Sequence, residues 1–542
     1  MKTAAAVVEI MKREGIDVLF GYPRNQLLEA AAIADIRTII VRQERIGMHM
    51  ADAVSRLTRG RKMGAFCMQH GPGAENAYGG VAQAYGDSVP VLVLPAGYAR
   101  RNAYLPFNFN STLQMAGVSK HCEPVTIGAE VPNIFRRAFT QLRNGRPQPV
   151  VVEIPYDAFD DEVPEPLAYT PVIRARYAPD PEAVAKASEV LLNAKRPVLY
   201  AGQGVHWAEA YKELQELAEL LAIPVCTSLP GKSSFDETHP LALGSGGNAH
   251  PKTVPHFLRE ADVIFGIGCS FTESSFAIAI PKGKTIIHST VDPVDINKSV
   301  IAHHALVGDA KLTLQAVIEA CRKKVSTRRD SSKVAGEIEA VTSEWMREWQ
   351  PRLTSNDNPM TPYRVLWDLQ NTVDVSETII THDAGSPRDQ LMPFWRTRKP
   401  LTYIGWGKTT QLGYGLGLAM GAKLVHPEKL CINVWGDAAI GFTGTDFETA
   451  VRERLPILSI LLNNSSMAIE LAIMPKATEK YRATDISGDY AAMARAFGGY
   501  GERITSPDEI IPAIKRGIAQ TKAGKPALLE FMTSQETRLS KY

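Results

Sequence analysis

Short apolar runs alternate with helical patterns along this chain, and this alternation limits its fold more than any other feature. In the first 160 residues, five such runs predict strands, with helical patterns between several of them. The five runs are 17–23, 38–44, 62–68, 89–94 and 149–154. Strands that alternate with helices form parallel sheets whose two faces are both covered by helices.

The same alternation recurs twice more. Two polar segments interrupt it: 158–182, which is rich in proline and acidic residues, and 326–360, which is polar and partly helical. Both read as linkers. With 542 residues the chain is long enough for about three domains. We therefore expect an α/β protein with three doubly wound parallel-sheet domains, at 1–160, 183–325 and 361–542.

Composition excludes several classes of protein. The chain is 45% hydrophobic and 22% charged with a formal net charge of +2, so we expect a globular protein without a nucleic-acid partner. It has no run of 18 apolar residues, and its first 15 residues predict an amphipathic helix and not a signal peptide. The six cysteines are scattered, without a CxxC pair, so neither a zinc site nor a disulfide framework is indicated. We expect a cytoplasmic protein that does not bind membranes.

Two polar residues follow neighbouring apolar runs in the last third of the chain. One run ends at Gly436-Asp437, and the next, 457–462, ends at Asn463-Asn464, which places Asp437 and Asn464 27 positions apart. Open α/β sheets bind ligands at the carboxyl ends of their strands. Carboxylate and amide oxygens suit Mg²⁺ or Ca²⁺, and a metal with few protein ligands usually shares phosphate oxygens. The pair therefore predicts a metal–diphosphate anchor.

An ordinary strand–turn–helix is the alternative interpretation of this stretch. In that case Asp437 caps a helix and Asn464 fills a turn. Each residue alone favours this interpretation, whereas the pair at this spacing favours the metal site.

The Gly-Asp to Asn-Asn stretch resembles the diphosphate-binding motif of thiamine diphosphate (ThDP) enzymes. The motif commonly has glycine after Gly-Asp, where this chain has Ala438. The resemblance implies that Mg²⁺ is bound by Asp437, by Asn464 and by the backbone carbonyl of Ser466. It makes 361–542 the diphosphate-binding domain.

A second resemblance covers most of the first domain. The segments 43–60, 69–76 and 87–90 resemble, in order, the pyrimidine-binding domain of the acetohydroxyacid (acetolactate) synthase and 2-oxoacid decarboxylase superfamily. In that family a His-Glu pair carries the glutamate that holds N1′ of the cofactor; this chain has Gln43-Glu44. The resemblance implies that Glu44, expected at the end of the second strand, favours the imino tautomer, which removes the C2 proton of the thiazolium.

Further cofactor contacts are expected in the third domain. The run 378–386 predicts a strand and a turn at Gly385 and Ser386 whose N–H groups suit phosphate. By resemblance, the carbonyl of Thr410 and the N–H of Leu412 hold the aminopyrimidine, and the Leu412 side chain bends the cofactor. The other expected cofactor-binding residues are Pro72, Asn76, Gly436, Ala438, Ala439 and Met467.

The central domain, 183–325, resembles the Rossmann-like central domain of the same superfamily. Gly202-x-Gly204 suggests a dinucleotide site, but Trp207 occupies the third glycine position and no acidic residue ends the next strand. FAD-binding members commonly have an arginine in a Gly-x-Arg-Phe stretch, which reads Gly268-Cys-Ser-Phe271 here. We therefore expect a structural domain without FAD.

Four side chains are candidates for contact with the substrate. Glu470, six residues after Asn464, matches a glutamate of pyruvate-decarboxylase-like members and is expected to protonate the reacting carbon. Arg24 follows Tyr-Pro, where relatives often have glycine, and suits a substrate carboxylate. His70, next to Gln69, suits a proton relay. A solvated arginine and a packing histidine are the simpler alternatives for Arg24 and His70.

These features together predict a ThDP- and Mg²⁺-dependent lyase or transferase. The expected reaction is decarboxylation of a 2-oxo acid to an enamine, followed by aldehyde release or by acetolactate synthase-like carboligation. By resemblance the enzyme is a homodimer or a homotetramer, with active sites at the subunit interface. Two alternatives stay open: a dinucleotide- or FAD-dependent oxidoreductase of the pyruvate oxidase type, and a non-catalytic ThDP-binding homologue.

Overall fold

The computed structural model describes residues 1–405, 407–409 and 411–542. The chain forms two compact units, and each draws on separate parts of the sequence. The first unit comprises Met1–Ala175, Gly413–Glu428 and Thr443–Ile457, and the second comprises Arg176–Leu412, Lys429–Phe442 and Leu458–Tyr542.

The first unit is built on a six-stranded sheet in the order β2-β1-β3-β4-β6-β5, in which each adjacent pair is parallel. Its strands are β1 (Val18–Gly21), β2 (Arg37–Ile40), β3 (Gly64–Met68), β4 (Val91–Gly97), β5 (His121–Pro124) and β6 (Val150–Pro155). Its α-helices are α1 (Thr3–Arg13), α2 (Leu27–Ile33), α3 (Glu44–Leu57), α4 (Pro72–Gly86), α5 (Ser111–Gln114), α6 (Val131–Arg143), α15 (Tyr414–Val425) and α17 (Phe447–Arg452).

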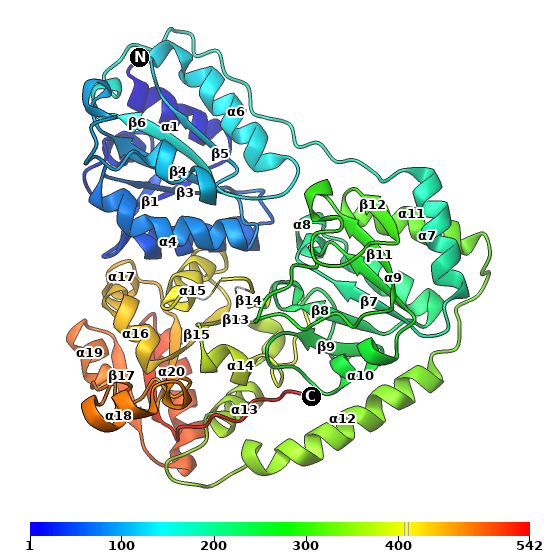
Figure 1. Cartoon of the computed structure of the whole chain (residues 1–542). Helices are drawn as coiled ribbons and strands as arrows, with labels where there is room; N and C mark the ends of the chain where they lie inside the picture. Colours follow the sequence, from blue (N-terminus) through cyan, green and yellow to red (C-terminus); the bar gives the residue numbers. More distant parts are fainter. Residues whose placement is uncertain (406, 410) are drawn as a thin grey trace. The chain divides into compact units, whose positions relative to one another are not determined.

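Helices cover both faces of this sheet. Helices α1, α2 and α6 share one hydrophobic core with the strands, while α4 lies on the opposite side (Figure 1). Helix α3 is almost wholly buried along its length because it packs on the sheet and also against α15. The unit is therefore a doubly wound parallel sheet, as the sequence predicts.

The second unit contains two further six-stranded parallel sheets. The first has the order β12-β11-β10-β7-β8-β9 and the second β14-β13-β15-β16-β18-β17. The strands of the first sheet are β7 (Pro197–Ala201), β8 (Val225–Ser228), β9 (Ala242–Gly246), β10 (Val263–Ile267), β11 (Thr285–Thr290) and β12 (His304–Val307). Those of the second are β13 (Thr378–His382), β14 (Tyr403–Ile404), β15 (Leu430–Gly436), β16 (Leu458–Asn463), β17 (Tyr500–Ile504) and β18 (Ala527–Met532).

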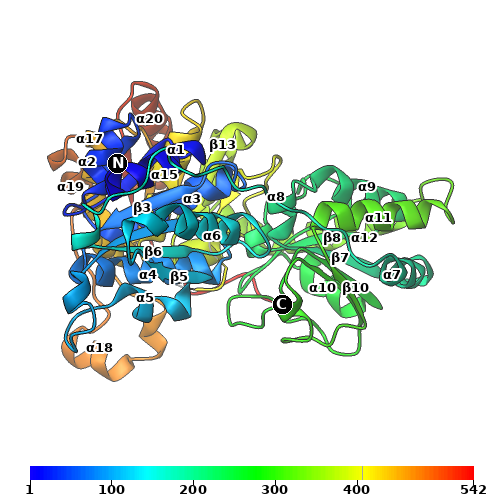
Figure 2. The same ribbon diagram turned by 90° about the horizontal axis from the view of Figure 1, so that it is seen from above.

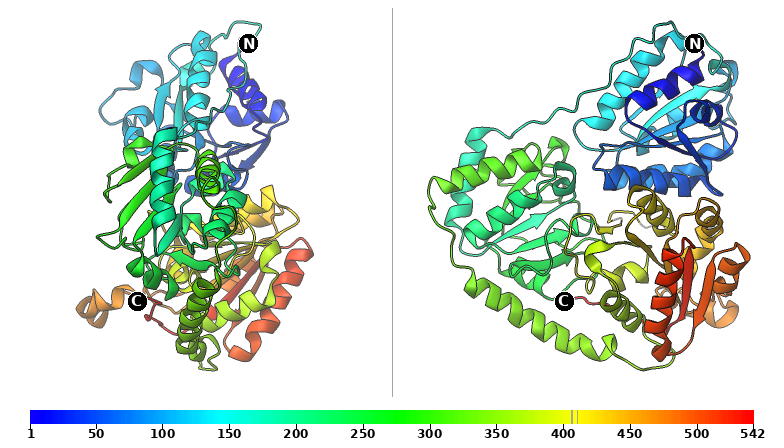
Figure 3. Two further views of the ribbon diagram at one scale, coloured as in Figure 1. Left: turned by 90° about the vertical axis from the view of Figure 1, so that its right-hand side faces the viewer. Right: turned by 180° about the vertical axis from the view of Figure 1, so that it is seen from behind.

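The second unit also contains the helices that lie around these two sheets. They are α7 (Pro181–Asn193), α8 (Gly204–Ala208), α9 (Tyr211–Leu221), α10 (Thr253–Glu260), α11 (Ala310–Arg322), α12 (Ser332–Leu353), α13 (Pro362–Thr372), α14 (Ser386–Leu391), α16 (Asp437–Thr443), α18 (Pro475–Tyr481), α19 (Tyr490–Ala496) and α20 (Ile510–Lys522). On the first sheet α7, α9 and α11 share one core and α10 belongs to another (Figure 2). On the second, α13 and α20 share a core with the strands (Figure 3).

The structure confirms the predicted fold class and adds strands that the sequence pattern did not reveal. The unpredicted strands are β5, β9, β12, β14, β17 and β18; all but β18 are edge strands, and edge strands bury less apolar surface. The domain boundaries 1–160, 183–325 and 361–542 stay predictions, and each sheet lies within one of them. In the described part of the chain, no helix is long and apolar enough to cross a membrane.

Candidate active site

The parallel pairing of β15 with β16 brings Asp437 and Asn464 together. Gly436 lies opposite Leu462, so the residues that follow both strands meet at the same sheet edge. Asp437 begins α16, and its Oδ2 accepts a hydrogen bond from the backbone N–H of Asn464 at 3.0 Å. The two residues therefore do meet, as the sequence pattern predicts.

Asp437 also organises the loop that follows β16. Its Oδ2 accepts from the N–H of Ser466 at 3.3 Å, and its Oδ1 accepts from the N–H of Ala438 at 2.8 Å. The Oδ1 of Asn464 accepts from the same Ser466 N–H at 3.0 Å. Burial raises the pKa of the Asp437 carboxyl, and its bonds to backbone N–H groups oppose that rise. The carboxylate of Asp437, at the start of α16, thus lies against the loop that carries the amide oxygen of Asn464 and the backbone carbonyl of Ser466.

The predicted phosphate turn lies at the same edge. Strand β13 pairs with β15 so that His382 lies opposite Val434, and Gly385 then turns with a φ of +79° into α14 at Ser386. Among the described residues, a Cβ on Gly385 would meet just the Ile469 side chain, at 3.7 Å, so glycine is needed there for its backbone angle.

The structure describes all but one of the remaining site residues predicted in the third domain. Gly436 and Ala438 flank Asp437, Ala439 is buried, and Met467 is half-buried and donates its N–H to the carbonyl of Thr484. Leu412 is half-buried, and Thr410 lies outside the described residues. Glu470 begins a 3₁₀ turn, Glu470–Ala472, and is half-buried.

In the first unit, Glu44 occupies a different element from the one expected. The predicted strand 38–44 ends at Ile40, and Glu44 is the first residue of α3. The prediction that Glu44 ends a strand was therefore wrong. The reason is that 41–43 leave the sheet as a short connection, which an apolar pattern does not resolve. A helix N-terminus favours a carboxylate, and Glu44 still lies beyond the carboxyl edge of the sheet.

Glu44 is buried beside the start of α4. Its side chain is 4% exposed and its Oε2 accepts a hydrogen bond from the amide of Asn76 on α4 at 3.1 Å. Burial raises its pKa, and the bonds from its own backbone N–H and from Asn76 oppose the rise. Pro72 begins α4, and a Cβ on Gly73 would lie 2.8 Å from the Gln69 side chain and 3.4 Å from Glu44 Oε1. The predicted residues Glu44, Gln69, Pro72 and Asn76 therefore form one cluster.

His70 and Arg24 lie on the neighbouring loops of the first unit. His70 packs edge-on against the rings of Tyr98 and Tyr156, at centroid distances of 4.5 and 5.5 Å. Burial and the nearby positive charge of Arg24 both lower the pKa of His70, so its neutral form predominates at pH 7. Arg24 is exposed.

Sequence reasoning missed Asp446, which fixes the connection that carries Glu44. It is fully buried at the end of a 3₁₀ turn, Gly444–Asp446, and its Oδ1 accepts from the backbone N–H of Arg42 at 2.8 Å and from the hydroxyl of Thr449 at 2.8 Å. Burial raises its pKa to about 6. No sequence signal identifies it, because Arg42 and Asp446 are 404 positions apart.

The Gly202 turn has a structural explanation. The N–H of Gly202 donates to the carbonyl of Ile267, and the N–H of Gly204 donates to the carbonyl of Gly268, both at 2.8 Å. A Cβ on Gly202 would lie 2.4 Å from the Gly268 oxygen. The glycines therefore allow two loops to pack closely, and these two N–H groups are not free to bind phosphate.

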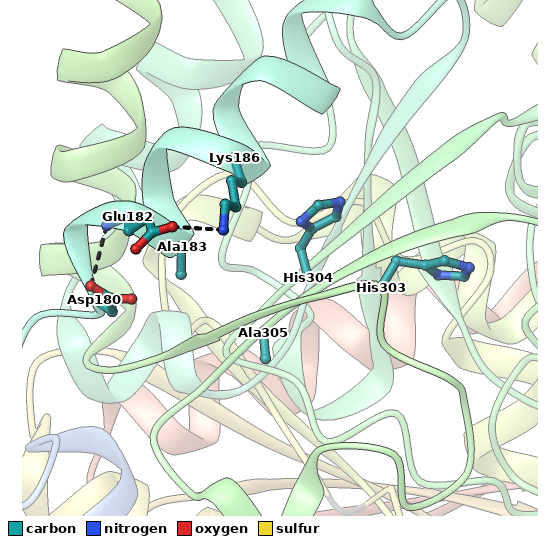
Figure 4. A pocket seen from close by; sticks show the side chains of 7 residues that line it. All are labelled: Asp180, Glu182, Ala183, Lys186, His303, His304 and Ala305. Atoms are coloured by element: carbon teal, nitrogen blue, oxygen red, sulfur yellow. Dashed lines mark hydrogen bonds and ion pairs between the residues drawn. The ribbon is translucent and has the colours of Figure 1, made fainter.

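A separate shallow pocket of about 250 Å³ lies at the start of α7 beside β12 (Figure 4). Its lining is Asp180, Glu182, Ala183, Lys186, His303, His304 and Ala305, and Lys186 is paired with Glu182 at 2.7 Å. None of the predicted site residues lines it. Within the described residues, no cluster of three or more His, Cys, Asp or Glu side chains suits a metal ion.

Comparison with known proteins identifies the family. Three models of the thiamine pyrophosphate enzymes match the chain: the N-terminal TPP binding domain at 1–117, the central domain at 184–317 and the C-terminal TPP binding domain at 383–531. The chain therefore belongs to the thiamine pyrophosphate enzymes.

Within that family the chain is similar to acetolactate synthase large subunits. It is 30% identical to the "Probable acetolactate synthase large subunit" of Methanococcus aeolicus, over 100% of this chain and 93% of the relative. The corresponding protein of Methanocaldococcus jannaschii is 30% identical over 98% and 92% of the two chains. The isozyme 3 large subunit of Escherichia coli is 28% identical over 96% and 92%. The chain is an acetolactate synthase-like, ThDP-dependent enzyme.

The residues present fit this cofactor. The hydroxyl of Ser466 is buried without a hydrogen-bond partner among the described residues, next to a carboxylate and an amide that are hard oxygen donors. In the first unit, the buried carboxyl of Glu44, which accepts a side-chain hydrogen bond from Asn76, suits a ring nitrogen that shares a proton with it.

Proposed function

We propose that this enzyme uses ThDP and Mg²⁺ to decarboxylate a 2-oxo acid and to join the remaining fragment to a second carbonyl compound. The observation that carries the proposal is the buried carboxyl of Glu44, whose Oε2 accepts a hydrogen bond from the amide of Asn76 and whose pKa is raised by burial. Burying an ionisable group costs free energy, and a non-catalytic homologue has no need to keep one there. The dinucleotide alternative is disfavoured because the N–H groups of Gly202 and Gly204 already donate to backbone carbonyls of a neighbouring loop.

ThDP, when bound, would supply a carbon nucleophile for the carbonyl of a 2-oxo acid and an electron sink for its decarboxylation. The role proposed for Glu44 is to exchange a proton with N1′ of the pyrimidine. Its raised pKa suits this role, because a carboxyl with a pKa closer to neutrality exchanges protons more readily near pH 7. Asn76 fixes the orientation of the carboxyl.

The proposed metal ligands are Asp437, Asn464 and the carbonyl of Ser466. Asp437 accepts two N–H groups of the loop that carries the other two, so the three ligands are held in place before the metal binds. Such preorganisation lowers the entropy cost of binding. Gly385, Ser386 and the residues around Asp437 are proposed to contact the diphosphate, and Thr410 and Leu412 the pyrimidine.

Glu470 and the residues of the first unit are proposed to control the fate of the substrate. Protonation of the reacting carbon by Glu470 releases an aldehyde, whereas attack on a second carbonyl gives a hydroxyketone. Gln69 and neutral His70 are proposed to line the substrate space, His70 as an uncharged proton relay. The overall similarity to acetolactate synthase large subunits favours carboligation, and Glu470 favours a competing aldehyde product.

The assembly is proposed to be a homodimer or a dimer of dimers in which the pyrimidine half comes from one subunit and the diphosphate half from another. Light scattering during ThDP titration tests this, since a fully active monomer contradicts it. We also propose a cytoplasmic enzyme without FAD. A yellow protein that releases flavin on denaturation would contradict the second point.

The test of the proposed function is a panel of 2-oxo acids supplied to the apoprotein with ThDP and Mg²⁺. CO₂, aldehyde and hydroxyketone are measured for each donor, alone and with aldehyde or 2-oxo acid acceptors. We expect CO₂ release from at least one donor and a hydroxyketone as a product. Absence of CO₂ release from the whole panel, with ThDP bound, overturns the proposal in favour of a non-catalytic homologue.

A further inference from the structure

Arg24 has a backbone conformation that disfavours every residue with a side chain. Its φ is +109°, outside the left-handed region that non-glycine residues occasionally adopt. Such a conformation persists only where the surrounding structure imposes it. Glycine would adopt it without a steric cost.

The following residue imposes this conformation. The Asn25 side chain is buried and donates to the carbonyls of Met68 and Leu94, at 2.9 and 3.0 Å, and its Oδ1 accepts from the N–H of Leu27 at 3.0 Å. These bonds tie the loop after β1 to the end of β3 and to the middle of β4. Arg24 is therefore held at a fixed place on the carboxyl edge of the sheet.

This place adjoins the loops that carry Glu44 and His70. The N–H of Val41 donates to the carbonyl of Gly21, and the N–H of Tyr22 donates to the carbonyl of Cys67, so the chain leaves β1, β2 and β3 side by side. The guanidinium of Arg24 lies near enough to His70 to lower the pKa of the imidazole. The structure shows no hydrogen bond or ion pair of the Arg24 side chain with any described residue, and the side chain is exposed.

The chemistry of a guanidinium limits what the Arg24 side chain can do in the reaction. It stays protonated at any working pH, so it neither donates nor takes a proton in the reaction, and its fork of N–H donors matches a carboxylate or a similar anion. A cation that held the carboxylate lost as CO₂ would stabilise the starting state more than the transition state, because that charge disperses as the bond breaks. Such binding slows the chemical step.

We propose that Arg24 binds an anionic group that the substrate keeps through the reaction, and so sets the specificity of the enzyme. This inference rests on the proposed function. Two sources share this chemistry: a second acidic group on the donor 2-oxo acid, and the carboxylate of an acceptor 2-oxo acid, which stays in the product. In both cases the retained anion pairs with Arg24 while Gln69 and His70 line the same space.

The test compares Arg24→Gly and Arg24→Lys with the wild type. Arg24→Gly removes both the cation and the backbone strain, so its melting temperature should equal or exceed that of the wild type. Arg24→Lys keeps the positive charge and the backbone strain but loses the forked N–H donors of the guanidinium. The control is Arg454→Gly, since Arg454 is another exposed arginine at positive φ, +54°, and belongs to no proposed site.

The loss of one charge-assisted hydrogen-bonded pair corresponds to roughly a tenfold to hundredfold fall in kcat/KM. For a donor anion, Arg24→Gly should show this fall in CO₂ release only with donors that carry two acidic groups. For an acceptor anion, CO₂ release should be unchanged, and joining to 2-oxo acid acceptors should fall while joining to uncharged aldehydes persists. Arg24→Lys should recover part of either loss, and Arg454→Gly should match the wild type.

An Arg24→Gly enzyme whose kcat/KM is unchanged for all donors and acceptors overturns the inference, as does an equal fall for charged and uncharged partners. Failure of the proposed function gives a different result, because the wild type itself then releases no CO₂ from any 2-oxo acid. The melting temperatures separate a folding defect from a loss of recognition.

Discussion

Replacing Asp437 by asparagine separates its role in the fold from its role in binding Mg²⁺. The carboxylate accepts three backbone N–H groups: Ala438 on Oδ1, and Asn464 and Ser466 on Oδ2. An amide has one oxygen, so it either keeps the bond from Ala438 or keeps the two bonds from the loop. The second orientation costs less, because only one bond is lost.

The magnitude follows from these contacts. One hydrogen bond to a charged group contributes about 1.5–3 kcal/mol, which is the expected local loss. A second effect offsets this loss. Burial raises the pKa of Asp437, which means that the charged carboxylate is costly to desolvate, and the neutral amide of Asp437→Asn avoids that cost. We therefore expect the metal-free Asp437→Asn protein to unfold within about 2 kcal/mol of the wild type, while the anionic metal ligand is lost.

Calorimetry and thermal unfolding, each with and without ThDP and Mg²⁺, are the assays. Bound at a hundred times its Kd, the cofactor stabilises the wild type by about 2.7 kcal/mol, and this increment should vanish in Asp437→Asn. Asp368→Asn is a matched control, because Asp368 is also a buried carboxyl with a raised pKa but pairs with Arg364. An Asp437→Asn protein that binds ThDP and Mg²⁺ with wild-type affinity refutes the metal assignment.

Two further predictions concern other carboxyl groups. Burial raises the pKa of Asp446 from about 3.8 to about 6, so its favourable contribution to stability is fully present below pH 3.8 and is lost as the pH rises through 6. Asp446→Asn should abolish that fall and be more stable than the wild type by up to about 3 kcal/mol at pH 7 to 8. Urea unfolding of both proteins between pH 4 and 8 measures this, and a stability difference that stays constant with pH would contradict the prediction. Glu470→Gln should shift the product ratio from aldehyde toward hydroxyketone, or stall after CO₂ release, and an unchanged ratio and rate would remove Glu470 from the mechanism.

Part of the site is local in the sequence and could be predicted from it. Asp437 and Asn464 each follow a buried strand, and the parallel pairing of adjacent strands makes the ends of these strands neighbours. The same reasoning places Gly385 and Ser386 at that edge, because β13 also pairs with β15. Periodicity and strand order are sufficient for such contacts.

Other features depend on contacts or backbone angles that no local pattern records. Glu44 was expected to end a strand and instead begins α3, because the connection 41–43 has no distinctive pattern. The bond from the Arg42 N–H to Asp446 joins segments that only the folded unit brings together. The positive φ of Arg24 follows from the buried hydrogen bonds of Asn25, which are set by three separate segments of the chain.

In the proposed reaction, a bound ThDP that Glu44 activates cleaves a 2-oxo acid. The most direct measurement is release of labelled CO₂ from the fastest carboxyl-labelled donor, in the wild type and in Glu44→Gln, each stripped of ligands and then reconstituted. We expect release by the wild type only when ThDP and Mg²⁺ are both present. We also expect that Glu44→Gln still binds ThDP but is slower by at least about a hundredfold, the usual loss for a missing proton-transfer group. Near-normal release by Glu44→Gln, or release by the wild type without either ligand, would contradict the proposed reaction.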